Sequence, residues 1–307
     1  MSALDRLLEN ADPSLEYQAT RDLLGGAPRR CRELRARIAA AGHGKLLLDK
    51  RGPDGHWGRG AYGPKWTCTH YVLFELLQLG LDPDNRACRE SAELLLRHPR
   101  GKDGGINYAR TVEYSDVCVN GMLLSIGGYF RLGERLLETP VDFLLETEMA
   151  DGGWNCEYFR GASRSSLHTT IAVIEGIERY LASGGSRRAG ELEAAKAKGI
   201  EFILIHELYK TRTTGEVIKD EFLKYVFPVR WKYDILRCLD YFREAGFGYD
   251  PRLEAALRIV EESGRKTGRW KGGAQAGRTY YRSDSGKWNT LRALRVLNHF
   301  GRETPGI

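Results

Sequence analysis

A repeat of about fifty residues constrains the fold of this chain more than any other feature. Six segments share one plan, in which a polar or aromatic start leads into an amphipathic stretch with apolar residues at helical spacing. The first four copies keep an interval of 50 residues between equivalent positions, which are Glu16, Trp66, Asp116 and Ser166. Two further copies, starting around Arg230 and Lys287, continue the pattern with looser spacing. Such a period predicts a series of helical hairpins.

Two other kinds of segment alternate with these apolar helices. More polar helical stretches begin near Arg29, Ala87, Gly190 and Pro251, and their polar faces favour an outer, solvated layer. Loops that combine glycine with an aromatic ring precede the apolar helices: DGHWG from Asp54, DGGINYA from Asp103, DGGWN from Asp151 and TGRWKGG from Thr267. Glycine lets the chain reverse with a positive φ, and the ring that follows fills the gap between neighbouring hairpins.

These observations predict an all-α fold with a single domain over residues 1–307. About six hairpins with apolar inner helices are expected to close into an α/α toroid, an inner ring of helices surrounded by an outer ring. The N-terminal segment SALDRLLEN would supply the sixth outer helix. An open solenoid is the alternative, but solenoid repeats usually run from about 33 to about 47 residues and end in polar caps. The longer period favours the closed ring.

Composition and charge argue against several classes of function. The chain has no stretch near 18 consecutive apolar residues, and its N-terminus carries acids where a signal peptide needs a basic start. We therefore expect a cytoplasmic protein without a transmembrane segment. The formal charge of +6 is modest for 307 residues, and no basic stripe is interleaved with aromatic residues, so nucleic-acid binding is not expected. Six cysteines without a C-x-x-C pair disfavour a disulfide framework or a zinc ribbon.

Two segments fifty residues apart carry side chains of metal-binding type. SDVCVNGML contains Asp116 and Cys118, and SSLHTTIAV places His168 at the position equivalent to Cys118 in the next repeat. At helix N-termini these side chains can converge, and the helix dipole favours a thiolate there. An oxygen, a sulfur and a nitrogen donor suit Zn²⁺, and three protein ligands leave a fourth position open for water or a substrate thiol. The competing interpretation is a polar cap cluster without metal, in which Asp116 is only an N-cap, Cys118 a core thiol and His168 a hydrogen-bonded imidazole.

The hairpins of about fifty residues and the DGG-aromatic loops resemble the terpenoid cyclase and protein prenyltransferase superfamily, over nearly the whole chain. The resemblance implies an α/α toroid that hosts cyclases, prenyltransferases or non-enzymes. The D-x-C segment at Asp116 and Cys118 is similar to the zinc-binding segment of prenyltransferase β subunits, and His168 matches the third ligand, preceded by Leu167 where the family has tyrosine. Arg110 matches the family's diphosphate-binding arginine.

Two departures from the family pattern point to a divergent enzyme. Glu113 stands where the family has a lysine that contacts diphosphate, and Val119 replaces the tyrosine after the cysteine. An acidic side chain at this diphosphate-contacting position would repel a diphosphate leaving group. Protein prenyltransferases also need a separate α subunit, and the sequence does not identify a protein partner.

The sequence leaves three functions open, with an enzyme favoured. The first is a zinc-dependent enzyme acting on a hydrophobic, isoprenoid-type substrate, with Cys118 at the metal and Arg110 facing an anionic group. The second is a metal-free, cyclase-like enzyme that uses Asp234 as a proton donor. The third is a non-catalytic ring that binds a lipid or a protein. We expect Trp66, Trp231, Tyr233 and Trp288 to line the substrate cavity, and Trp57, Trp154 and Trp270 to wedge between hairpins.

Overall fold

The computed structural model describes residues 2–109, 111–273 and 277–303, and every regular element in these ranges is a helix. Two isolated β-bridges, Arg100 with Ile106 and Lys210 with Val217, are the only extended pairings there. The prediction of an all-α fold is therefore confirmed. In the same ranges, no helix has both the length and the apolar character needed to cross a membrane.

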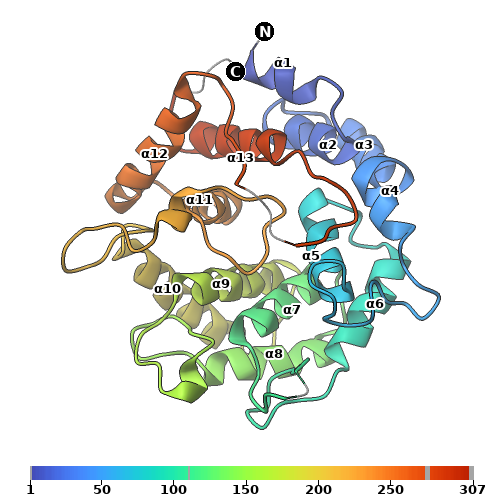
Figure 1. Ribbon diagram of the computed structural model, residues 1–307, viewed down its shortest axis with the longest axis vertical. Coiled ribbons are helices and arrows are strands. Elements are labelled where there is room, and N and C mark those ends of the chain that lie inside the picture. Colours follow the sequence, from blue (N-terminus) through green and yellow to red (C-terminus); the bar gives the residue numbers. More distant parts are fainter. Residues whose placement is uncertain (1, 110, 274–276, 304–307) are drawn as a thin grey trace.

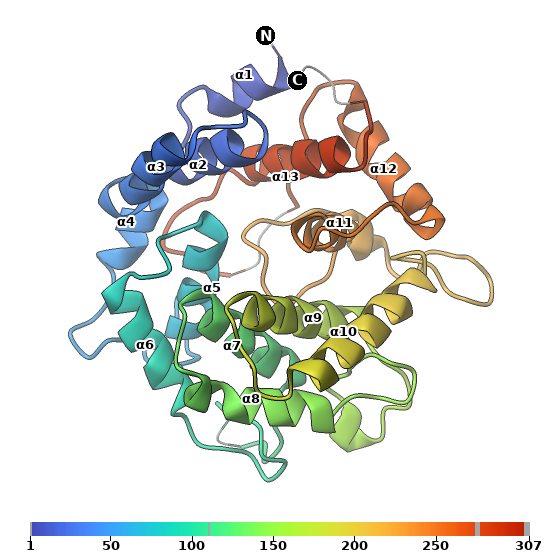
Figure 2. The same ribbon diagram turned by 180° about the vertical axis from the view of Figure 1, so that it is seen from behind.

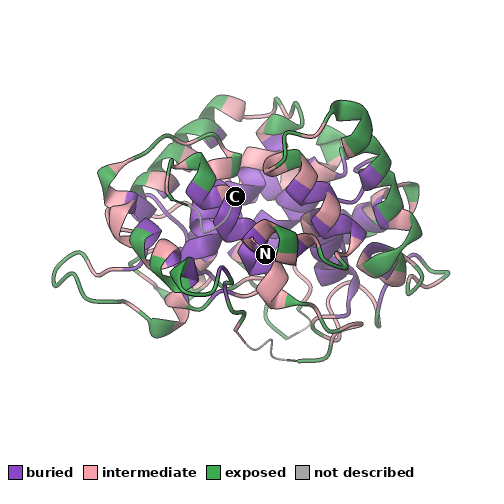
Figure 3. Cartoon of the chain, turned by 90° about the horizontal axis from the view of Figure 1, so that it is seen from above, coloured by how far each residue is buried: buried purple, intermediate pink, exposed green. Residues whose placement is uncertain are grey.

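Six helices that begin within about five residues of the repeat positions lie around the middle of the molecule (Figure 1). They are α2 (Pro13–Asp22), α5 (Thr69–Leu79), α7 (Val117–Tyr129), α9 (Leu167–Ala182), α11 (Ile235–Glu244) and α13 (Ser285–His299). Buried residues are concentrated on these helices, as Figure 3 shows. We call them the inner helices.

The remaining helices lie outside the inner ones (Figures 1 and 2), and most of their exposed residues are polar. They are α1 (Ala3–Leu8), α3 (Pro28–Ala40), α4 (Gly42–Leu48), α6 (Arg86–Leu96), α8 (Glu134–Glu146), α10 (Ala189–Leu204) and α12 (Glu254–Arg265). Short 3-10 helices occur at Tyr158–Arg160, Asp220–Leu223 and Pro251–Leu253. Helix α1 packs against α13 and α2, which places the first helix of the chain beside the last (Figure 1).

Three loop tryptophans each join an outer helix to the inner helix that follows it. Trp57, Trp154 and Trp270 are fully buried, and each indole Nε1 donates a 2.7 Å hydrogen bond to a carbonyl ten residues back, on α4, α8 and α12 respectively. Their backbone N–H groups donate to a threonine hydroxyl on the next inner helix, Thr69, Thr170 or Thr290. The same wedge thus recurs three times, as the loop pattern predicts. Gly152 in DGGWN has a φ of 88°, the left-handed turn that glycine permits.

Helices α7 and α9 make the closest approach between inner helices. A Cβ on Gly176 would lie 2.3 Å from the carbonyl oxygen of Gly121, and a Cβ on Gly121 would lie 2.8 Å from that of Ala172. Only glycine at these two positions permits the two backbones to come so close. This contact holds the starts of α7 and α9, with Cys118 and His168, next to each other.

Candidate functional site

The three residues expected to bind zinc line one cavity at the N-terminal ends of the inner helices. Asp116, Cys118 and His168 share this space of about 250 Å³ with Trp231, and its other lining residues are Tyr62, Lys65, Asn155, Cys156, Ser166 and Thr169. Asp116 occupies the N-cap position of α7, but its side chain makes no capping hydrogen bond and is exposed. We call this space the thiol cavity.

A second cysteine completes the thiol cavity. Cys156 follows the DGGWN loop, and its Sγ accepts hydrogen bonds from the Cys118 N–H at 3.3 Å and from the Thr169 hydroxyl at 3.6 Å. The two thiols also share a hydrogen bond, which raises the pKa of Cys118 and lowers that of Cys156. The sequence analysis missed Cys156. Its position two residues after the loop tryptophan, just before the helix that carries His168, is the signal that would have found it.

Both ring nitrogens of His168 have partners. Nδ1 accepts a 2.8 Å hydrogen bond from the backbone N–H of Tyr233, so Nε2 carries the proton of the neutral ring. Nε2 lies 3.4 Å from a carboxylate oxygen of Glu221. Burial, reinforced by the charge of Lys219, lowers the pKa of His168 to about 4, so the imidazole is neutral at pH 7.

The residues of the thiol cavity do not fit a zinc ion as they are arranged. A histidine that binds zinc through Nε2 normally donates its Nδ1–H to an acceptor, whereas Nδ1 of His168 itself accepts an N–H. The thiol of Cys118 faces Cys156. Across the described ranges, no three His, Cys, Asp or Glu side chains converge as a metal site requires. Zinc binding stays a prediction that would need both His168 and Cys118 to reorient.

A larger and more apolar cavity adjoins the thiol cavity. It has a volume of about 410 Å³, and Trp66, Trp231 and Tyr233, three of the four expected lining residues, contribute to it. Val226, Pro228 and Val229 supply further apolar surface, and Trp231 lines both cavities. We call this space the apolar cavity.

Asp234 also lines the apolar cavity, where it caps helix α11. Its Oδ1 accepts a 2.8 Å hydrogen bond from the Arg237 N–H and lies 3.9 Å from the guanidinium of Arg292. Burial nevertheless raises the pKa of this carboxyl group. Asp234 thus combines the structural role of an N-cap with contact to the cavity.

Glu113, at the position of the family's diphosphate-contacting lysine, lines neither the thiol cavity nor the apolar cavity. The carboxylate of Glu113 is exposed and pairs with Lys102 at 2.7 Å. Arg110, which matched the family's diphosphate-binding arginine, lies outside the described residues.

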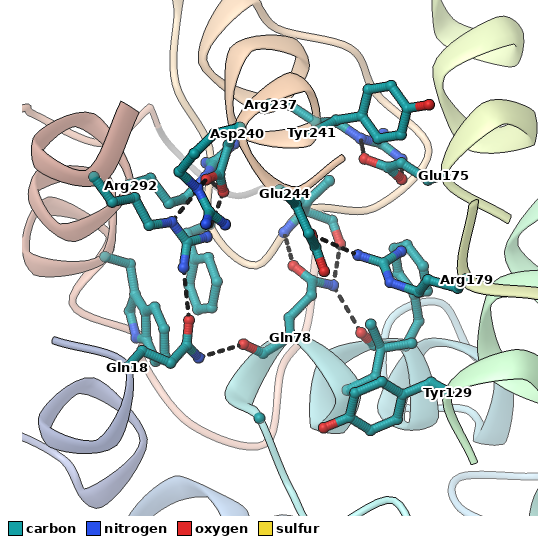
Figure 4. A pocket seen from close by; sticks show the side chains of 18 of the residues that line it. Gln18, Gln78, Tyr129, Glu175, Arg179, Arg237, Asp240, Tyr241, Glu244 and Arg292 are labelled. Carbon is teal, nitrogen blue, oxygen red and sulfur yellow. Dashed lines mark hydrogen bonds and ion pairs between the residues drawn. The ribbon is translucent and has the colours of Figure 1, made fainter. Parts of the chain in front are cut away.

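The opposite end of the inner helices encloses a polar cavity of about 130 Å³ (Figure 4). Trp288, the fourth expected lining residue, faces this cavity and not the apolar one, and it stacks on Phe227 with ring centroids 4.1 Å apart. All six inner helices contribute to the lining, with Gln18, Gln78, Tyr129, Arg179, Glu244 and Arg295 among the residues. The space on this side of the molecule is therefore not the hydrophobic pocket expected from the sequence.

The positive charge of the arginines in the polar cavity is complementary to the helix ends that lie there. Seven arginines line it against three carboxylates, and the C-terminal ends of the inner helices, which carry partial negative charge, lie there. Ion pairs join the lining: Arg237 with Glu175 at 2.6 Å, Arg295 with Asp22 at 3.1 Å and Arg243 with Asp240 at 3.0 Å. We interpret this network as structural, since most of these arginines are already paired with a carboxylate.

Comparison with known proteins adds no assignment, because no protein-family model and no curated protein matches this chain.

Proposed function

We propose that the chain is an α/α toroid and acts as an enzyme on a hydrophobic, isoprenoid-type substrate bound at the N-terminal ends of its inner helices. Closure of the ring is supported by the polar cavity, to which each of the six inner helices contributes lining residues. A hydrogen bond of 3.0 Å from the Arg295 guanidinium on α13 to the Gln18 side-chain oxygen on α2 also joins the last inner helix to the first. These contacts are the ones that a ring requires.

The observation that carries the proposal is the shared wall of the two cavities. Trp231 lines the apolar cavity on one side and the thiol cavity on the other. A hydrophobic molecule in the apolar cavity would place one end beside Cys156. Enclosed apolar surface next to a few convergent polar groups is typical of small-molecule sites.

We assign Cys156 the role of nucleophile. Two donors, the Cys118 N–H at the start of α7 and the Thr169 hydroxyl, are directed at its Sγ and would stabilise a thiolate there. Neutral His168 closes the cavity through its bonds to Tyr233 and Glu221. This assignment uses only side chains that the structure places together.

Ligand protection of the thiols tests the proposal. The purified chain is incubated with farnesol or geranylgeraniol, treated briefly with iodoacetamide, and the labelling of Cys156 is measured by peptide mass spectrometry. We expect the isoprenoid to slow the labelling, and Trp231→Ala to abolish the protection. Tyr249→Ala, at an aromatic residue that is 54% exposed, is the matched control and should keep the protection. Unchanged labelling at saturating isoprenoid would contradict the proposal.

Turnover then separates an enzyme from a binding protein. Isoprenoid alcohols, their diphosphates and squalene are incubated with the wild type and with Cys156→Ser, and products are sought by mass spectrometry. Product from the wild type alone supports the nucleophile, whereas tight binding without product supports the non-catalytic ring.

A cyclase-like mechanism is the second candidate, because Asp234 lines the apolar cavity and has a raised pKa. A carboxyl group that keeps its proton in an apolar site can protonate an alkene. Asp234→Asn preserves a good N-cap residue while removing the acid. Turnover that is lost in Asp234→Asn but survives in Cys156→Ser would favour this mechanism over the first.

A further inference from the structure

Arg230 lines the apolar cavity and has no carboxylate partner among the described residues, unlike most of the arginines that line the polar cavity. Its guanidinium carbon lies 4.2 Å from the centroid of the Trp66 ring, so the cation stacks on the indole. Its Nη2 is buried and has no hydrogen-bond partner among the described residues, and no carboxylate in those ranges lies within 4.0 Å of the group. By contrast, Arg237, Arg292 and Arg295 each have a carboxylate within that distance. A buried hydrogen-bond donor without an acceptor costs free energy, so the simplest explanation of the unpartnered Nη2 is an acceptor that the described residues do not supply.

The carboxyl groups that line the apolar cavity, Glu221 and Asp234, already have partners. Glu221 lies 3.4 Å from His168 and 3.5 Å from Lys232, and Asp234 accepts the Arg237 N–H. Glu75, whose charge also acts on Arg230, accepts the hydroxyl of Tyr281 and is not within ion-pair distance of the guanidinium. None of these carboxylates is placed to neutralise Arg230.

Arg230 lines the apolar cavity together with the stacked Trp66. Lys224 lines the same cavity and has no ion pair among the described residues, which leaves a second positive charge there. The inner helices also point their N-terminal ends, which carry partial positive charge, toward this side. Val226, Pro228, Val229 and Trp231 supply apolar surface to the same cavity, and its other charged lining residues are Glu221, Lys232 and Asp234. The cavity therefore combines two cations that have no ion pair among the described residues with apolar surface.

We propose that Arg230, held on the face of Trp66, binds the anionic head group of an amphiphilic ligand whose apolar chain lies along Val226, Val229 and Trp231. The head group is a phosphate monoester or a carboxylate, since both offer two oxygens to the planar donor fork of a guanidinium. This inference rests on the proposed function, because it assigns the substrate class of the same apolar cavity.

A series of ligands with one chain and different head groups tests the inference. Dodecyl phosphate, dodecanoate, dodecanol and dodecyltrimethylammonium are titrated below their micelle concentrations, and binding is followed by tryptophan fluorescence and calorimetry. At least one anionic ligand should bind about tenfold or more tightly than dodecanol, and the cation more weakly than dodecanol. A preference for dodecyl phosphate over dodecanoate identifies a phosphate ester as the head group, and the reverse identifies a carboxylate.

Variants connect the preference to Arg230. Arg230→Gln should reduce the affinity for the anionic ligand to that for dodecanol, while Arg230→Lys keeps a charge and should retain part of the preference. Arg29→Gln, at a side chain that is 87% exposed on α3, is the control and should leave every affinity unchanged. Circular dichroism confirms that each variant is folded.

The outcomes separate this inference from the proposed function. Equal binding of the anionic ligands and dodecanol, or an unchanged preference in Arg230→Gln, overturns the head-group site and leaves the hydrophobic-substrate proposal standing. If none of the four ligands binds, both proposals are wrong.

Discussion

The backbone N–H of Cys118 donates a hydrogen bond to the Sγ of Cys156, 3.3 Å away, although the two residues are 38 positions apart in the sequence. The bond joins the first turn of α7 to the loop that precedes α9. A repeat of helical hairpins thereby brings two thiols together that no sequence motif connects.

Iodoacetamide should label Cys156 before the buried cysteines. Cys68, Cys88 and Cys238 are fully buried, and burial raises the pKa of each of these thiols. Cys156 lines an open cavity and has a lowered pKa, so we expect its alkylation at pH 7 to be at least about tenfold faster. A time course of peptide mass spectra measures the rates. Thr169→Val, which removes a donor to Sγ, should slow Cys156 alone, and equal rates for all cysteines would contradict the interpretation.

Metal analysis tests the zinc prediction directly. Because the Tyr233 N–H occupies Nδ1 of His168, we expect the chain purified without chelator to hold well below one zinc per molecule. Cys118→Ala should leave that content unchanged. Stoichiometric zinc in the wild type that disappears in Cys118→Ala would show that His168 and Cys118 reorient around a metal.

The fold follows from the sequence because its signals are local and repeated. Glycine marks each turn, the loop tryptophan marks each wedge, and apolar spacing marks each inner helix, so the all-α class could be predicted without any long-range contact. Trp57, Trp154 and Trp270 make the same hydrogen bond in three different hairpins. Because the same pattern recurs in several segments, an ambiguous assignment of one segment does not change the predicted fold class.

The site was harder to predict because it depends on contacts between repeats. The repeat alignment placed Cys118 and His168 at one end of the inner helices, but it could not show that the Tyr233 N–H, 65 residues beyond His168, takes its Nδ1. The alignment also gave Trp288 the same role as Trp66, yet its ring faces the polar cavity. Trp66 lies three residues before α5 begins, whereas Trp288 lies three residues after α13 begins. Residue spacing does not resolve this difference where the repeat loosens.

Gly176 should not tolerate alanine. The added Cβ would lie 2.3 Å from the Gly121 carbonyl oxygen, and backbone cannot move aside as a flexible side chain can. We expect Gly176→Ala to lower the free energy of unfolding by about 1–3 kcal/mol or more, measured by urea denaturation. Gly190→Ala on α10 is the control, because a Cβ there meets nothing within 4 Å and should be neutral or stabilising by up to about 1 kcal/mol. Equal stabilities of the two variants would disprove the close contact of α7 with α9.

Glu75 should make stability depend on pH. Burial raises its pKa to about 7 from the ordinary 4.5, although the Tyr281 hydroxyl and the charge of Arg230 oppose the shift. Between these values the unfolded chain loses the proton while the folded chain keeps it, so the free energy of unfolding falls as pH rises, by about 3 kcal/mol in total. Glu75→Gln keeps an acceptor for Tyr281 and has no proton to lose. Its stability relative to the wild type should rise from pH 4.5 to pH 7 and then level off, and a difference that is independent of pH would refute the raised pKa.

The pair of Arg237 and Glu175 should hold α11 to α9. The two side chains form two hydrogen bonds of 2.9 and 2.6 Å and are only 2% and 10% exposed. Arg237→Met leaves the Glu175 carboxylate buried without its partner, which should cost about 3–5 kcal/mol, whereas replacing both residues by Met and Leu should restore much of the loss. The exposed pair of Arg29 and Glu33 is the matched control, and Arg29→Met should change stability by no more than about 0.5 kcal/mol. If Arg237→Met is as mild as the control, this pair does not hold α11 to α9.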